Sequence, residues 1–278
     1  MITPRTWFIT GTSSGIGRHL TELLLAKGER VAATARKTES LDDLKAQYGE
    51  QLWVRSLDVT DTAAIRHVVE EAFRDLGRID AIVSNAGYAL VGAGEELQDD
   101  QIVQQINTNL IGSIQLIRAA LPHLREQGGG RILQVSSEGG QITYPNFSLY
   151  HTTKWGIEGF VETVAKEVAP FQIAFTIIEP GPTRTNFGGG IVSPPPMEVY
   201  DNTPAGEVRR AVASGEFKAP GDAVKVAQAM IDSVDVTPAP QRLLFGGDAY
   251  ERVHQALTDR LAALEAQKDL AYSTDTDV

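Results

Sequence analysis

The stretch Thr10-Gly11-Thr12-Ser13-Ser14-Gly15-Ile16-Gly17 decides the fold. It follows directly on a β-branched and aromatic run, Thr6–Thr10, and leads into a segment with apolar residues at helical spacing. Glycines in such a loop suit a tight turn, close approach of the backbone to a phosphate, and close packing of a helix on a strand. Placed between a first strand and a first helix, the Gly-x-x-x-Gly-x-Gly spacing predicts a site for the pyrophosphate of a dinucleotide.

Short aliphatic or β-branched runs alternate with longer amphipathic segments along the first two-thirds of the chain. This alternation of strands and helices predicts βαβ units, and hence a doubly wound, Rossmann-like parallel sheet with helices on both faces. No linker separates two cores, so we expect residues 1–278 to form a single NAD(P)-binding α/β domain. The predicted strands are Thr6–Thr10, Arg30–Ala35, Leu52–Leu57, Ala81–Ser84, Arg131–Val135 and Ile173–Ile178.

Two segments depart from this alternation. Residues 186–220 hold runs of three glycines and three prolines before a short helical piece at Ala205–Ser214. A long irregular excursion in a compact domain is typically a lid over a site or a tolerated surface insertion. After a last strand at Arg242–Phe245, we expect a helix from about Asp248, as N-cap, to Gln267, followed by a loose polar tail.

Composition excludes several classes of function. The 278 residues carry 36 acidic and 25 basic side chains, a net charge of −11, and no basic run, so neither nucleic acid nor a membrane surface is an expected partner. The absence of cysteine excludes thiolate catalysis and cysteine-rich metal sites, and no metal is expected. No apolar stretch approaches the roughly 18–20 residues that span a bilayer, and no signal pattern precedes the first strand, so we expect a cytoplasmic protein.

The tip of the second strand bears on the choice of dinucleotide. In dinucleotide-binding folds an acidic residue at this point binds the adenosine ribose, whereas an arginine accommodates a 2′-phosphate. Here Val31–Ala35 is followed by Arg36 and Lys37, without a carboxylate. Because a guanidinium pairs with phosphate through charge-assisted hydrogen bonds, the sequence predicts NADP(H), with Arg36 and Ser13 at the 2′-phosphate. The alternative is that Arg36 and Lys37 form a solvated turn.

Tyr150 and Lys154 lie four residues apart at the start of a helical pattern that continues through Val168, so both side chains project from one helix face. A neighbouring ammonium lowers the pKa of a tyrosine, which can then serve as general acid or base on a carbonyl or an alcohol. This spacing alone is common on helix surfaces. Ser137, however, ends a strand pattern at the sheet edge where open α/β folds bind ligands.

Taken together, these motifs resemble those of the short-chain dehydrogenase/reductase family, over nearly the whole chain from Thr6 to about His254. The resemblance implies an NADP-dependent alcohol dehydrogenase or carbonyl reductase. Ser137 precedes Tyr150 by the interval usual in that family. The matching motifs are Thr10-Gly11-x-x-x-Gly15-Ile16-Gly17, Asp58-Val59, Asn85-Ala86-Gly87, Asn109 in Asn109-Leu110-Ile111-Gly112, Ser137, Tyr150-x-x-x-Lys154 and Pro180-Gly181.

The resemblance also implies a role for each matched residue. Tyr150 would protonate the carbonyl oxygen or take the alcohol proton, Ser137 would hold that oxygen, and Lys154 would lower the Tyr150 pKa and bind the nicotinamide ribose. Asn109 would bind a water that joins Lys154 to solvent. The cofactor-binding residues implied are Gly11, Ser13, Ser14, Gly15, Ile16, Gly17, Arg36, Asp58, Val59, Asn85, Ala86, Gly87, Tyr150, Lys154, Pro180, Gly181, Thr183 and Thr185.

Two segments, 138–147 and 187–200, are expected to shape the substrate pocket. They contain no Arg or Lys, which favours a neutral hydrophobic ketone or secondary alcohol over a phosphorylated or carboxylate-bearing substrate. The apolar side chains they offer are Ile142, Tyr144, Pro145, Phe147, Phe187, Ile191, Val192 and Met197.

Two other functions stay open at this point: a non-catalytic NADP(H)-binding sensor or scaffold, and a lyase or epimerase that retains its nicotinamide. The resemblance further implies a homodimer or homotetramer built on the helices around Gln101–Leu124 and Thr152–Val168.

Overall fold

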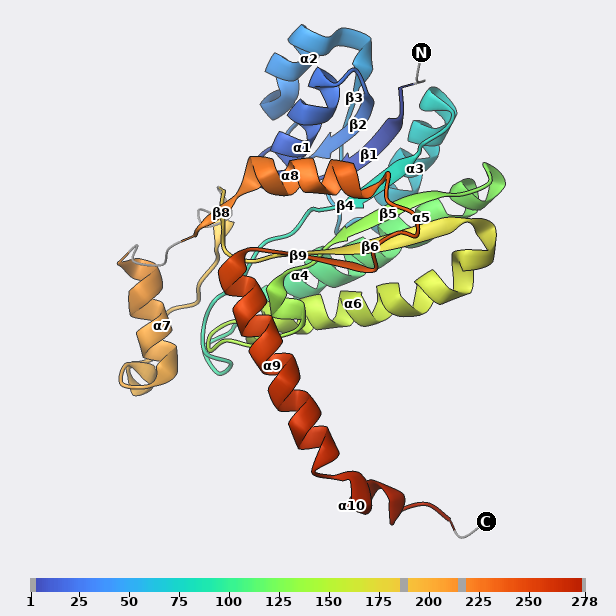
Figure 1. The fold of residues 1–278 in the computed structure, drawn as a ribbon. Helices are drawn as coiled ribbons and strands as arrows, with labels where there is room; N and C mark the ends of the chain where they lie inside the picture. The colour runs from blue at the N-terminus through green and yellow to red at the C-terminus, as the bar shows by residue number, and fades with distance from the viewer. Residues whose placement is uncertain (1–3, 186–189, 215–218, 277–278) are drawn as a thin grey trace.

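A sheet of seven parallel strands runs through the molecule (Figure 1). The computed structural model describes residues 4–185, 190–214 and 219–276. The strands are β1 (Thr6–Thr10), β2 (Arg30–Ala35), β3 (Leu52–Ser56), β4 (Ala81–Ser84), β5 (Gly130–Val135), β6 (Ile173–Pro180) and β9 (Arg242–Phe245). They lie in the order β3-β2-β1-β4-β5-β6-β9. The order reverses between β1 and β4, and ligands bind beyond the carboxyl ends of strands at such a switch point.

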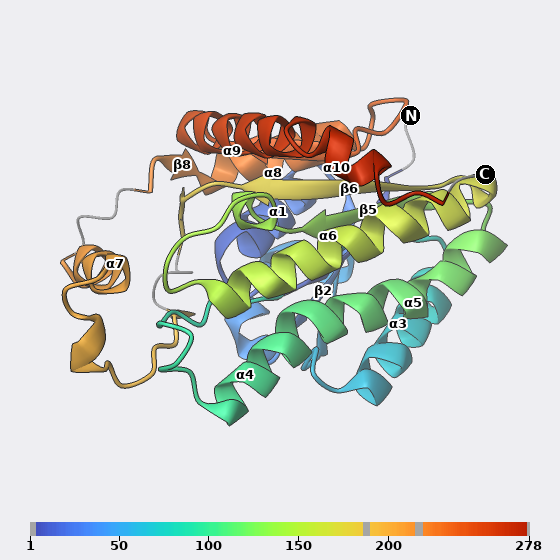
Figure 2. The same cartoon turned by 90° about the horizontal axis from the view of Figure 1, so that it is seen from below.

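Helices cover both faces of the sheet, as Figure 2 shows. Along β1, Phe8 points to a core shared with α3, α5 and α6, whereas Trp7 and Ile9 point to a core shared with α1 and α8. The helices are α1 (Gly15–Ala26), α2 (Asp42–Tyr48), α3 (Thr62–Leu76), α4 (Asp99–Ile106), α5 (Gly112–Glu126), α6 (Ser148–Val168), α7 (Pro204–Ala213), α8 (Ala223–Ser233), α9 (Gly247–Glu265) and α10 (Lys268–Tyr272).

The predicted doubly wound α/β sheet is confirmed. The observed strands match the predicted ranges closely, and the largest difference lies in β6, which continues to Pro180. The cause is β9, which pairs with β6 from Ile177 to Pro180 and so extends the sheet past the predicted end. This pairing carries regular structure directly into the Pro180-Gly181 motif.

The described part of the excursion between β6 and α8 makes backbone contacts with the body. Val192 forms a bridge with Leu90, and β7 (Thr183–Arg184) pairs in parallel with β8 (Gly221–Asp222) across its two ends. The helix α7 lies within one residue of the predicted piece. Phe187 and the rest of residues 186–189 and 215–218 lie outside the described residues.

The C-terminal helix extends away from the sheet (Figure 1). It begins at Gly247 behind Gly246, which has φ +113°, a left-handed conformation that suits glycine. The prediction of Asp248 as N-cap is therefore wrong: Asp248 lies in the first turn and pairs with Arg252 at 2.8 Å. The predicted loose tail is also wrong in part, because residues 268–272 form α10.

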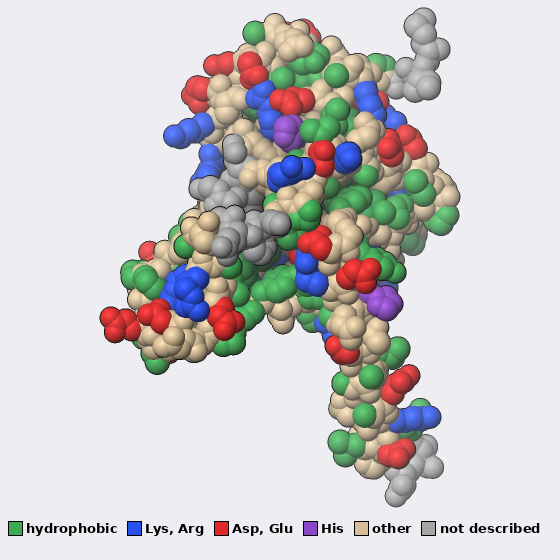
Figure 3. All heavy atoms as spheres, turned by 60° about the vertical axis from the view of Figure 1, so that its left-hand side comes forward, with side chains coloured by type: hydrophobic (Ala, Val, Ile, Leu, Met, Phe, Trp, Pro, Cys, Tyr) green, Lys and Arg blue, Asp and Glu red, His purple; other side chains and the backbone are tan. Residues whose placement is uncertain are grey.

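Charged side chains of both signs are interspersed on the face seen in Figure 3, which also shows hydrophobic side chains along the projecting C-terminal helices. Leu257, Leu261 and Leu264 are among the exposed apolar residues of α9. Within the described ranges, no helix combines the length and the apolar character needed to cross a membrane.

Candidate active site

The glycine loop is tied to the tip of β2. The carbonyl of Thr34 accepts hydrogen bonds from the backbone N–H groups of Gly11, at 3.0 Å, and Thr12, at 3.1 Å. Arg36 lies two residues beyond Thr34, and its carbonyl accepts from the Ser56 hydroxyl at 3.1 Å. Arg36 and Ser13 are both exposed. These bonds hold the loop and the cationic strand tip at the same edge of the sheet.

Two glycines of the loop have no room for a side chain. A Cβ at Gly17 would lie 2.4 Å from the Gly11 carbonyl oxygen and 2.5 Å from Asn85 Nδ2. Gly11 has φ +71°, and a Cβ there would meet the Cα of Ala86 at 2.9 Å. In the described structure the first turn of α1 carries no acidic side chain, and Ser14 forms no side-chain cap. This cradle fits the phosphates of a dinucleotide at a helix N-terminus.

Asn85 braces the same loop from β4. Its Nδ2 donates to the carbonyls of Thr10, at 2.9 Å, and Gly11, at 3.1 Å. The Thr10 hydroxyl in turn accepts from the N–H groups of Asn85 and Ala86. The sequence placed Asn85 to Gly87 along the adenosine, and the structure adds that Asn85 fixes the shape of the loop.

Asp58 and Val59 follow β3 at this edge. The Asp58 carboxylate accepts from the N–H of Thr60 at 2.9 Å and from its hydroxyl at 2.8 Å. These hydrogen bonds, with a smaller contribution from the Arg36 charge, hold the pKa of Asp58 below its usual value. A Cβ at Gly112 would lie 2.6 Å from the Val59 carbonyl oxygen, so the glycine allows α5 to approach closely.

Asn109 lies in a π-helical turn, Asn107–Ile111, that joins α4 to α5. Its buried side chain accepts from the N–H of Tyr88 at 3.1 Å and donates to the Tyr88 carbonyl at 2.8 Å and to Thr153 Oγ1 at 3.4 Å. Asn109 therefore ties the segment after Gly87 to α6. The water that would join it to Lys154 stays a prediction.

The structure brings Ser137, Tyr150 and Lys154 together at the carboxyl end of β5. The Ser137 hydroxyl accepts from the Gly139 N–H at 3.1 Å and hydrogen-bonds the Tyr150 hydroxyl. Lys154 is buried, with its Nζ 5.5 Å from the centre of the Tyr150 ring and donating to the Val135 carbonyl at 3.0 Å. A hydroxyl pair beside a buried ammonium is suited to proton exchange with a carbonyl or an alcohol.

The net shift of the Tyr150 pKa in this structure is upward, because burial outweighs the interactions that favour the phenolate. Burial raises the pKa of Tyr150 to about 12, the nearby Glu138 charge adds to this rise, and the hydrogen bond from Ser137 opposes it. Burial also lowers the pKa of Lys154 to about 8, against the opposing charge of Glu158. The Lys154 ammonium is directed at the Val135 carbonyl and at the face of the Tyr150 ring.

The segment 180–185 links the two halves of the site. The N–H of Gly181 donates to the Phe245 carbonyl at 2.8 Å, and the Thr183 hydroxyl donates to the Gly181 carbonyl at 2.8 Å. A Cβ at Gly15 would lie 3.5 Å from Thr185. The Ser137 hydroxyl lies 3.5 Å from the Pro180 carbonyl oxygen, so the segment runs from beside the catalytic candidates to the glycine loop.

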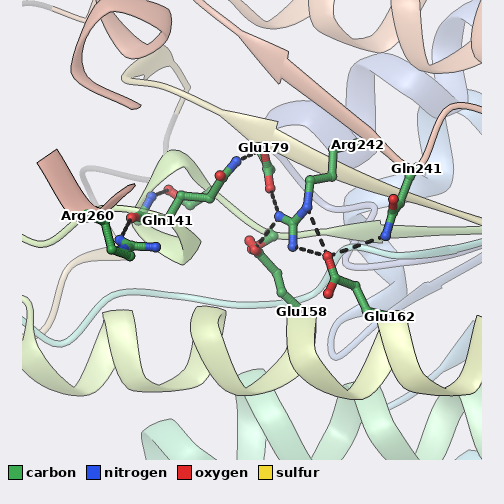
Figure 4. A network of polar contacts seen from close by, with 10 residues as sticks. Gln141, Glu158, Glu162, Glu179, Gln241, Arg242 and Arg260 are labelled. Atoms are coloured by element: carbon green, nitrogen blue, oxygen red, sulfur yellow. Dashed lines mark hydrogen bonds and ion pairs between the residues drawn. The ribbon is translucent and has the colours of Figure 1, made fainter. Parts of the chain in front are cut away.

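Sequence reasoning missed a partly buried ionic network behind these residues (Figure 4). Arg242 on β9 faces three carboxylates: Glu158 Oε2 at 2.5 Å, Glu162 Oε1 at 2.6 Å, and Glu179. Glu158 also bonds the Ser136 hydroxyl, and Gln141 Nε2 donates to Glu179 at 2.6 Å. Glu158 follows Lys154 by four residues on α6, so helical spacing from Tyr150 onward was the available signal.

One guanidinium cannot neutralise three carboxylates, and burial with the charge of Glu158 raises the pKa of Glu179 to about 7. A native pKa above the unfolded value means that the native state holds the extra proton, so stability falls as pH rises through this window. The free energy of unfolding of the wild type is therefore expected to fall by something on the order of 3 kcal/mol between pH 5 and pH 8. In Glu179→Gln this fall is expected to be absent. Urea unfolding at pH 5 and at pH 8 measures the two free energies of unfolding, with Glu162→Gln as control. An equal fall of the free energy of unfolding in wild type and in Glu179→Gln would contradict the prediction.

The substrate side is more polar than the sequence suggested. Arg252 from α9 reaches Glu138, immediately after Ser137, so a cation does lie beside the expected pocket. Ile142 is buried in the body, whereas Val192 and Met197 are exposed. Tyr144, Phe147 and His151 pack together as an aromatic group next to Tyr150. In the part of the chain that the structure describes, no group of three or more His, Asp or Glu side chains could hold a metal ion.

Comparisons with known proteins agree with this geometry. The family described as short chain dehydrogenase matches residues 5–194. Oxidoreductase BOA17 of Botryotinia fuckeliana (strain B05.10) is 37% identical over 272 residues, which cover 96% of this chain and 98% of that protein. The structure of a short-chain dehydrogenase from Streptomyces avermitilis has a TM-score of 0.92 at 37% identity and covers 99% of this chain and 100% of that one. The closed form of a serine dehydrogenase complexed with NADP+ has a TM-score of 0.73 at 25% identity, over 86% of this chain and 94% of that one.

Proposed function

The chain belongs to the short-chain dehydrogenase family and is an oxidoreductase, and we propose that it interconverts a neutral hydrophobic ketone and its secondary alcohol with NADP(H). The observation that carries this proposal is the hydrogen-bonded Ser137–Tyr150 pair beside the buried ammonium of Lys154. The glycine cradle supports dinucleotide binding, and the NADP+ complex of the serine dehydrogenase supports the choice of cofactor.

In this proposal NADPH, when bound, supplies the hydride that the carbonyl carbon accepts. Tyr150 donates its hydroxyl proton to the carbonyl oxygen, and Ser137 donates a hydrogen bond that holds the same oxygen. Lys154, buried between Tyr150 and Val135, carries the positive charge that stabilises the phenolate left behind. In oxidation the same groups act in reverse, with Tyr150 taking up the alcohol proton.

The test is a titration of the purified protein with NADPH and with NADH, followed by a screen of neutral ketones for NADPH consumption. Turnover of neutral ketones supports the proposal. Binding without consumption of any substrate favours a sensor or scaffold, and conversion of a substrate without net release of oxidised nicotinamide favours a lyase or epimerase. Good turnover of phosphorylated substrates with poor turnover of neutral ketones would overturn the substrate class.

Arg36→Asp tests the cofactor assignment. Replacing the cation at the tip of β2 by a carboxylate removes the partner of the 2′-phosphate and repels it, so NADPH affinity is expected to fall by about tenfold to a hundredfold. NADH affinity is expected to stay the same or rise. Fluorescence titration measures both dissociation constants, with Arg118→Asp, on α5, as a control of equal charge change. An unchanged NADPH/NADH preference would show that Arg36 belongs to a solvated turn.

We also propose that the chain forms a homodimer or homotetramer through α4, α5 and α6. Val103 on α4, Trp155 on α6 and Ile111 in the π-helical turn between α4 and α5 are exposed apolar side chains, which supports an interface there. Arg260 of α9 lies 4.8 Å from the ring of Trp155, so α9 covers part of the same surface.

A further inference from the structure

We infer that Arg252, carried by α9, is a positioning residue for the proposed reaction, because it holds Glu138 and thereby fixes Ser137 and neutralises a charge beside Tyr150. This inference rests on the proposed function. Ser137 follows β5, and Tyr150 and Lys154 lie on α6, whereas Arg252 would support these residues from the C-terminal helix α9.

Glu138 and Arg252 form a two-pronged ion pair. Arg252 Nε donates to Glu138 Oε2 at 3.1 Å, and Nη2 donates to Oε1 at 3.0 Å. Arg252 is itself oriented by Asp248, one helical turn earlier, at 2.8 Å. Glu138 is 4% exposed, so without Arg252 a buried charge would lose its partner. The fork geometry is specific to arginine.

Glu138 shares a tight turn with the catalytic candidate. The Ser137 hydroxyl accepts from the Gly139 N–H, and the Ser137 carbonyl accepts from the Gly140 N–H at 2.9 Å. The helix α9 holds this turn at a second point, where Arg260 Nη2 donates to the Gln141 carbonyl at 2.6 Å (Figure 4). A displacement of residues 138–141 would therefore move the hydroxyl that is proposed to hold the substrate oxygen.

Arg252 also affects the charges around Tyr150, because it is the counter-ion of Glu138. Tyr150 is faced by Glu138 from the turn, by Lys154 on α6, and by the ring of His151, whose pKa burial lowers to about 4, so it is neutral. Glu138 is faced by Arg252 and Asp248 from α9 and by Tyr144. Burial raises the pKa of Glu138, and Arg252 opposes that rise. Removal of Arg252 raises the pKa of Glu138 further, and above that pKa the Glu138 charge acts on Tyr150 without a counter-ion.

The experiment compares Arg252→Met, Glu138→Gln and the double variant, with Arg252→Lys, which keeps the charge without the fork, and with Arg118→Met as control. The first readout is hydrogen exchange of the amides of residues 139–142, which needs no substrate. We expect exchange in Arg252→Met to be about tenfold faster there and unchanged in β1. Unchanged exchange in the turn would overturn the positioning role.

The second readout is kcat for alcohol oxidation below the pKa of Tyr150, where the rate follows the fraction of ionised Tyr150. We expect kcat of Arg252→Met to be about tenfold lower than that of wild type, as for a rise of about one unit in the Tyr150 pKa, and the double variant to recover the wild-type value. A loss of kcat that the added Glu138→Gln does not recover would overturn the electrostatic role. Faster exchange in Arg252→Met together with an inactive wild type would refute the proposed function and leave the positioning role standing.

Discussion

Tyr150→Phe is expected to lower kcat for ketone reduction by at least about a hundredfold, and up to ~10⁴-fold, because general acid–base catalysis contributes on this scale. The substitution removes the hydroxyl that hydrogen-bonds Ser137 and keeps the ring against which Lys154 lies. NADPH affinity is therefore expected to change by less than about threefold, which is within about 0.7 kcal/mol. Steady-state NADPH consumption measures kcat, and fluorescence titration measures binding.

Phe147→Leu is the matched control, since Phe147 packs edge-on to Tyr150 with ring centres 6.2 Å apart and carries no proton. It is expected to change KM through the shape of the pocket and to retain most of kcat. Ser137→Ala is expected to lower kcat by less than Tyr150→Phe, because the hydroxyl of Tyr150 remains. Full activity of Tyr150→Phe would remove Tyr150 from the mechanism.

Arg242→Met is expected to lower the free energy of unfolding by about 3–5 kcal/mol at pH 8, the cost of leaving a buried charge without its partner. Glu158 and Glu179 are almost fully buried, and Arg242 is the cation that lies between them. Denaturant unfolding followed by circular dichroism measures the loss.

The pH dependence of this variant gives an internal check. In Arg242→Met the two carboxylates bind protons more readily in the native state, so the deficit relative to wild type is expected to shrink as pH falls toward 5. Adding Glu158→Gln and Glu179→Gln to Arg242→Met is expected to recover most of the stability, since neither of these two buried carboxylates is then left charged without Arg242. A deficit that is equal at pH 5 and pH 8 would show that Arg242 stabilises through packing of its stem instead.

The strands were predictable because each is a short apolar run between turns rich in glycine and polar residues. The glycine loop after β1 then indicated which class of α/β fold these strands form. Tyr150 and Lys154 were predictable from their helical spacing together with the other motifs, and Ser137 from its place at a strand end. These features are local, and the chain carries them within a few residues. The parallel sheet then brings the ends of β1, β4 and β5 to one edge by topology.

The ion pairs that support the site were not predictable in the same way. Arg242 lies 84 residues from Glu158 and Arg252 lies 114 residues from Glu138, so sequence spacing does not indicate either pair. The direction of the Tyr150 pKa also depended on burial, which follows from tertiary packing. The start of α9 was placed wrongly because Asp248 is a good N-cap by type, whereas Gly246 occupies that position with a positive φ.

The place of β9 and α9 in the chain has a consequence for biosynthesis. A growing chain can pair β1 to β6 and pack α6 before residue 242 leaves the ribosome, and at that stage Glu158 and Glu179 lack Arg242. Arg252 follows later still and completes the turn that carries Ser137. We therefore expect nascent chains to form the glycine loop that holds the dinucleotide early in translation. The arrangement around Ser137 and Tyr150 is expected to be complete only when β9 and α9 have emerged.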